Sequence, residues 1–116
     1  MKQRPLLVLA WLALAGCTND PAPNEQMRLT AKAVEQARAV GADAQIEEML
    51  NAERKLARAE KNMGEEDYKR ARVLAEQAEL DARLAEAKVL KLKSQKQLDE
   101  LNARITRLRK QLGELP

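Results

Sequence analysis

The chain has 116 residues, a formal net charge of +3, 45% hydrophobic residues and only two aromatic ones, Trp11 and Tyr68. This length allows one small domain, and the scarcity of bulky side chains argues against a thick globular core. There is no histidine, and Ser94 and Cys17 are the only serine and cysteine. The inventory therefore excludes Ser, Cys and His catalysis and argues against a zinc site. We predict a non-enzymatic protein without a metal or a cofactor.

The first residues have the pattern of a secretory leader. Lys2 and Arg4 precede ten apolar residues that run from Leu6 to Ala15. As a helix this run would span only about 15 Å, which is half of a bilayer core and too short for a transmembrane segment. We predict that residues 1–16 are a signal peptide.

Leu14, Ala15, Gly16 and Cys17 resemble the lipobox of bacterial lipoproteins. The resemblance implies that Cys17 becomes an N-terminus that carries two or three acyl chains, enough for durable attachment to a membrane. An ordinary secreted protein with a free thiol is the alternative. Thr18 stands where aspartate would signal retention in the inner membrane. We therefore expect the outer membrane, facing the periplasm, while the inner membrane stays open because sorting rules differ between bacterial groups.

Residues 17–24 are expected to form the lipidated cysteine and a tether, since two prolines and polar neighbours oppose helix formation. Seven tether residues reach at most about 25 Å. A first helix is expected from Asn24, which can cap it, to Val40, with Gly41 as the residue that ends it.

A second helix is expected to start with Asp43 as its N-cap and to end at Gly64. Its apolar residues recur at spacings of three and four, which places them on one face. They are Ile46, Met49, Ala52, Leu56, Ala59 and Met63.

A third helix is expected to begin near Asp67 and to continue without glycine or proline to Leu112, a length of about 70 Å. Its first part carries a repeat of mostly small residues: Tyr68, Ala71, Ala75, Ala78, Ala82, Ala85, Val89 and Leu92. Small residues let a neighbouring backbone approach closely. We therefore pair this part with the second helix as an antiparallel hairpin, in which the second helix covers the third only to about Val89.

A second repeat, of large apolar residues, follows in the third helix: Leu98, Leu101, Ile105, Leu108, Leu112 and Leu115. Its phase differs from that of the first repeat by two residues, roughly 200° around the helix, which indicates two faces with two partners. The second helix is too short to cover the leucine repeat. We expect these residues to mediate self-association or to bind a partner helix. The alternative is internal packing on the first helix.

The C-terminal part is also strongly basic, with eight bases against two acids between Lys88 and Lys110. The bases are Lys88, Lys91, Lys93, Lys96, Arg104, Arg107, Arg109 and Lys110. They suit an anionic partner such as lipopolysaccharide phosphates, peptidoglycan or an acidic helix; the alternative is an ordinary solvated face. Nucleic acid is not expected, because this region has no aromatic residue to stack on bases. The positions that flank the leucines carry no acids, so an acidic partner helix fits better than a parallel homodimer.

The segment from Glu66 to Lys88 resembles the bacterial family called domain of unknown function 4398, which has the pattern Asp-Tyr-x-x-Ala-x-x-Leu-Ala-Glu-Gln-Ala-x-x-Asp-Ala. Residues 52–59 fit the preceding helix of that family, and the resemblance covers residues 36–88. It implies a small envelope protein, typically a lipoprotein, in some cases joined to or encoded beside an OmpA-like peptidoglycan-binding domain. It offers no catalytic residues.

These patterns together predict an all-α fold: an antiparallel helical hairpin with a short first helix, and a long C-terminal helix with a coiled-coil-like extension. The expected divisions are the signal peptide 1–16, the tether 17–24, the alanine-rich hairpin 25–92 and the leucine-heptad extension 93–116. We expect a periplasmic scaffold or partner-binding lipoprotein that acts through its C-terminal helix. The alternatives are a lipoprotein that binds the cell wall or lipopolysaccharide through its basic helix, and an activator of a wall-synthesis enzyme. An OmpA-like protein and peptidoglycan are the candidate partners besides the membrane.

Overall fold

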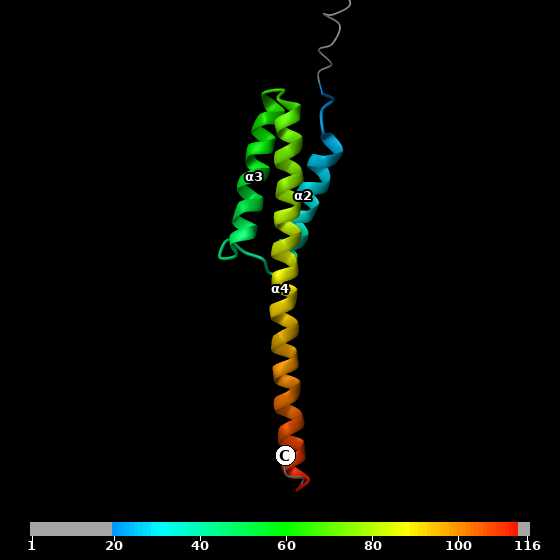
Figure 1. Ribbon diagram of the computed structural model, residues 1–116, viewed down its shortest axis with the longest axis vertical. Coiled ribbons are helices and arrows are strands. Elements are labelled where there is room, and N and C mark those ends of the chain that lie inside the picture. Colours follow the sequence, from blue (N-terminus) through cyan, green and yellow to red (C-terminus); the bar gives the residue numbers. More distant parts are fainter. Residues whose placement is uncertain (1–19, 114–116) are drawn as a thin grey trace, which may run out of the picture.

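A computed structural model describes residues 20–113, which fold into three α-helices. These are α2 (Asn24–Ala39), α3 (Glu47–Gly64) and α4 (Tyr68–Gln111). Helices α2 and α3 lie against the N-terminal half of α4, and the C-terminal half of α4 extends beyond them (Figure 1). The predicted all-α fold, with a hairpin and a long C-terminal helix, is confirmed. The signal peptide, the lipobox and Cys17 lie outside the described residues.

The small-residue repeat of α4 forms the core of the bundle. Ala71, Ala75, Ala78, Ala82 and Ala85 are fully buried, as the spacing predicts. Alanine side chains project little from the helix, so the backbones of both α2 and α3 can approach α4 closely. Val89 is buried and Leu92, the last residue of that repeat, is 68% exposed, which confirms that the packed part of α4 extends only to about Val89.

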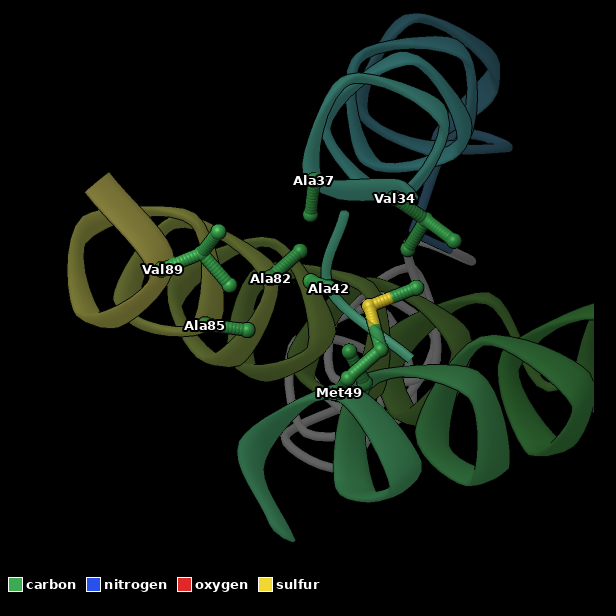
Figure 2. Close-up of a cluster of buried hydrophobic side chains, with 8 residues drawn as sticks. Val34, Ala37, Ala42, Met49, Ala82, Ala85 and Val89 are labelled. Atoms are coloured by element: carbon green, nitrogen blue, oxygen red, sulfur yellow. The ribbon is translucent and has the colours of Figure 1, made fainter. Parts of the chain in front are cut away.

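The predicted apolar face of α3 is also confirmed. Met49, Ala52 and Ala59 are buried, and Met49 is the largest fully buried hydrophobic side chain of the described chain. Figure 2 shows Met49 pointing from α3 toward Val34 of α2. One bulky side chain thus fills the space that the alanines leave open where the three helices meet.

Thr30 fastens α2 to α4 through a buried hydroxyl group. The side chain is fully buried, and its Oγ1 lies 2.9 Å from the carbonyl oxygens of both Gln26 and Ala75. A buried hydroxyl without a partner would be destabilising, so these contacts fix the depth and the register of α2 on α4.

Helices α2 and α3 end in the same hydrogen-bonded motif. After α2, the N–H of Ala42 donates to the carbonyl of Ala37 (2.9 Å), and Gly41 adopts the predicted left-handed conformation with φ of 101°. After α3, the N–H of Asp67 donates to Asn62 (2.9 Å). The left-handed residue there is Glu66, with φ of 60°, whereas Gly64 is the last residue of the helix.

Two predicted helix caps are wrong. Residue Pro23, and not Asn24, is the N-cap of α2, because its carbonyl already accepts the N–H of Met27 (3.0 Å). The carboxylate of Asp43 accepts the N–H of Gln45 (2.9 Å), which is a local turn. Helix α3 therefore begins only at Glu47. The Asp67 cap of α4 is confirmed, since its carboxylate accepts the N–H of Arg70 (3.2 Å).

We predict that Ala82→Leu destabilises the bundle by about 1–3 kcal/mol, because the seam has no room for three more carbon atoms. The matched control is Ala103→Leu on the exposed part of α4, which should change the free energy of unfolding by less than about 0.5 kcal/mol. Urea denaturation followed by circular dichroism measures both. Equal effects of the two substitutions would show that the alanine seam is not tightly packed.

A second pair of variants tests the chain reversal after α2. Gly41→Ala should lower stability by about 1 kcal/mol, because φ of 101° is unfavourable for a residue with a Cβ atom. Gly64→Ala is the control, since its Cβ would meet nothing within 4 Å and α3 is helical there. This change should leave stability equal or raise it by up to about 1 kcal/mol. An unchanged free energy of unfolding in Gly41→Ala would contradict the account.

Candidate interaction surface of the C-terminal helix

Charged contacts fix the N-terminal half of α4 between its neighbours. Lys55 of α3 and Asp81 of α4 form a half-buried ion pair at 2.6 Å, and about two turns further along Lys88 pairs with Glu48. The amino group of Lys93 donates to the carbonyl of Val40 at the end of α2 (2.6 Å). Every described residue after Val89 is exposed, so the packed part of α4 ends at this level.

Glu79 links α2 to α4 on the opposite side. The carboxylate accepts hydrogen bonds from Arg83 (2.6 Å) and from Gln26 of α2 (2.7 Å). The Arg83 hydrogen bond, helped by that of Gln26, holds the pKa of Glu79 below its ordinary value of 4.5. The hydrogen bond from Lys88 likewise lowers the pKa of Glu48. Both carboxylates therefore favour the bundle when they are ionised.

The large apolar residues of the second repeat lie on a bare surface. Leu98, Leu101 and Leu108 are each about half exposed (54%, 51% and 52%), Ile105 is 39% exposed and Leu112 is 75% exposed. Helix α2 packs beside the alanine part of α4 and does not reach them (Figure 1). The alternative of internal packing on the first helix is therefore wrong.

The same apolar face continues backward along the bundle, which the sequence analysis missed. Val73, Leu80 and Leu84 are exposed and lie at the heptad positions of the second repeat. We call the whole set the leucine face: Val73, Leu80, Leu84, Leu98, Leu101, Ile105, Leu108 and Leu112. The signal was available, because counting back from Leu98 in steps of seven reaches Leu84. The face is interrupted by polar residues at Gln77, Lys91 and Ser94.

The basic candidates differ in what they contact. Lys88 and Lys93 are engaged with the bundle as described, and Lys96 lies 4.0 Å from Glu100 on the same helix. The others (Lys91, Arg104, Arg107, Arg109 and Lys110) are exposed. Within residues 20–113, neither Lys91, Arg104 nor Arg109 has a carboxylate within 4.0 Å. Unneutralised positive charge therefore lies beside and within the leucine face.

The described residues offer little for chemistry. Between residues 20 and 113, no group of His, Cys, Asp or Glu is placed to hold a metal ion. The hollows described beside α2 and α4 are shallow, the larger about 360 Å³ and bounded by Pro23, Leu29 and Arg72. Tyr68 is half-buried in the first turn of α4. In the same part of the chain, no helix is both long and apolar enough to cross a bilayer.

The arrangement defines a class of protein: a small three-helix bundle with one helix that projects from it. Residues 25–101 match the family described as Domain of unknown function (DUF4398). The chain is similar to a DUF4398 family protein from Pseudomonas aeruginosa PAO1 whose crystal structure is known, with 62% sequence identity and a TM-score of 0.79. The match covers 81% of this chain and 98% of that chain. The chain belongs to the DUF4398 family, and the match is wider than the predicted residues 36–88. No curated protein matches the chain.

The crystallised relative also bears on folding. Because 98% of its chain is matched, it contains little beyond the part that it shares with this protein. The folded chain of that relative therefore consists of about this helical part.

The Glu79 contacts predict a specific dependence of stability on pH. A lowered pKa in the folded state means that stability is fully present above pH 4.5, and that it is lost as the pH falls through the folded pKa. Glu79→Gln should therefore be less stable than the natural chain at pH 7, by up to about 1 kcal/mol, and the difference should shrink as the pH falls below 4.5. Thermal unfolding at a series of pH values measures the difference. A difference that stays constant as the pH falls below 4.5 would show that Glu79 acts through packing and not through its charge.

Proposed function

We propose that this protein is a non-enzymatic lipoprotein of the bacterial envelope, which holds α4 as a docking helix for another protein. The observation that carries the proposal is the exposed leucine face on a helix that continues past its own bundle. Burial of a leucine side chain contributes about 1.5–3 kcal/mol, so a row of them in water favours association.

The direction of α4 supports this role. Helix α2 runs parallel to α4, as contacts from Arg72 with the carbonyl of Pro21 to Lys93 with Val40 indicate. The described chain therefore begins beside the α3–α4 turn, at the end of the bundle opposite the free half of α4 (Figure 1). If Cys17 is acylated, a tether of about 25 Å at most would hold this end near the membrane. Helix α4 has 44 residues, about 66 Å at 1.5 Å per residue, and would then point away from the membrane.

The basic charge alone gives weaker support for direct binding of cell wall or lipopolysaccharide. Lys88, Lys93 and Lys96 already have partners within the chain, and the other bases are spread around the helix. A surface that binds a polyanion needs unneutralised positive charge on one side of the helix. The large apolar residues from Leu98 to Leu112 lie on one side of the helix, whereas the free bases do not, so a protein partner is the better candidate.

The anchor is tested by Cys17→Ser. We expect the natural chain to fractionate with membranes and to incorporate labelled palmitate in cells, and the variant to lose both properties because the thioether cannot form. The Gly16 and Thr18 neighbours stay unchanged, so the comparison concerns the sulfur alone. Palmitate incorporation into the variant would remove the lipoprotein proposal.

The docking role is tested in intact cells with a photoreactive amino acid. At Leu101, on the leucine face, it should give a discrete crosslinked product of higher mass. At Ala103, an exposed position on the other side of α4, it should give little or none. Equal crosslinking from the two positions, or none from Leu101, would contradict the docking role.

A further inference from the structure

The leucine face forms one heptad pattern along almost all of α4. With Leu84 and Leu98 at position a, Ile105 and Leu112 are also at a, and Val73, Leu80, Leu101 and Leu108 are at d. The buried residues of the bundle, such as Ala78 and Ala82, fall at b and f on the opposite side. A single additional helix can therefore lie along the back of α4 without displacing α2 or α3.

The middle of this pattern is polar. Lys91 occupies an a position and Ser94 a d position, between the two apolar stretches. Lys91 is exposed and has no carboxylate within 4.0 Å in the described part of the chain. A lysine at a selects the register and the identity of the opposing helix, because its charge needs a partner there.

The positions that flank the pattern differ between the two halves of α4. In the bundle half, Asp81 pairs with Lys55, Arg83 with Glu79, and Lys88 with Glu48. In the free half, the flanking e and g positions hold bases and amides only: Gln95, Gln97, Asn102, Arg104, Arg109 and Gln111. In the free half, the charge at these flanking positions is thus positive only.

We infer that the leucine face binds an amphipathic helix of another protein, with an apolar seam, acidic flanks and a carboxylate opposite Lys91. This inference rests on the proposed docking role and adds the chemistry of the partner. It also extends the docking surface from the free half of α4 to Leu84 and Leu80 on the bundle. The complementary charge would set the register, while the leucines would supply most of the affinity.

A second copy of this chain fits the same surface poorly. In a parallel pair, position g faces e of the other copy five residues on, which sets Arg104 against Arg109 and Arg83 against Lys88. Glu76 would likewise face Asp81. In an antiparallel pair that matches Leu98 with Leu108, the two copies of Arg104 face each other. Each arrangement therefore brings like charges together beside the seam.

The test uses two synthetic helical peptides as probes. Both have leucine at a and d, with one glutamate at a to oppose Lys91; one peptide has glutamate at e and g, and the other has lysine there. Binding to residues 18–116 is followed by fluorescence anisotropy. We expect the acidic peptide to bind at least about 100-fold more tightly than the basic one at low salt, and the difference to shrink at high salt.

Matched variants locate the site. Leu84→Asp on the bundle half and Leu101→Asp on the free half should each weaken binding of the acidic peptide by at least about tenfold, whereas Ala103→Asp should leave it within about threefold. Lys91→Leu should change which residue is preferred opposite position 91. The variant should bind an acidic peptide that has leucine there more tightly than the acidic peptide that has glutamate there.

Several results would overturn the inference. These are equal binding of the two peptides, no binding of either, or no effect of Leu84→Asp. Sedimentation of the natural chain as a dimer that Leu101→Asp dissociates would identify a second copy as the occupant. A crosslink from Leu101 to a different protein in cells would leave the docking role standing when the peptide test fails, so the two proposals fail separately. A crosslink between two copies of this chain would contradict both.

Discussion

The close approach of two helices to the alanine face of α4 is the interaction on which the rest of the structure depends. Ala75, Ala78 and Ala82 are fully buried, yet each removes little apolar surface from water. The bundle therefore also relies on Met49 in the gap, on the buried Thr30 hydroxyl and on ion pairs such as Lys55–Asp81. Because these contacts occupy one side of α4, neither α2 nor α3 covers its opposite side in the part of the chain that the structure describes.

This division explains what could be predicted from the sequence. The spacing of apolar residues placed the helices and the buried face of α3 correctly, because that spacing reflects burial directly. The predicted caps at Asn24 and Asp43 were wrong. The first turn of α2 already begins at Pro23, and the carboxylate of Asp43 accepts a local hydrogen bond from Gln45. The end of the packed part near Val89 was also predictable, because the second helix is too short to cover α4 further, and Leu92 beyond it is exposed. The leucine face was only half recognised. On spacing alone, the small-residue repeat and the large-residue repeat are successive segments of α4, whereas the leucine face also runs behind the small-residue repeat.

The two faces of α4 have different chemistry, and this difference connects fold with proposed role. The alanine face is neutral and tightly packed, and the charges around it are paired within the chain. The leucine face is exposed and is flanked in the free half by Arg104 and Arg109. A protein that only needed a stable bundle would have no use for five further turns of helix with an apolar stripe. Family membership in DUF4398 agrees with the fold and leaves the partner to be identified by this surface.

Amide hydrogen exchange of residues 18–116 tests most directly whether the free half of α4 depends on a partner. A helix without tertiary packing opens readily, so amides beyond Lys93 should exchange much faster than those between Ala71 and Val89. Addition of the acidic peptide should slow exchange from Leu98 to Leu108 and leave the buried seam unchanged. Strong protection of residues 98–108 in the monomeric chain alone would contradict this account.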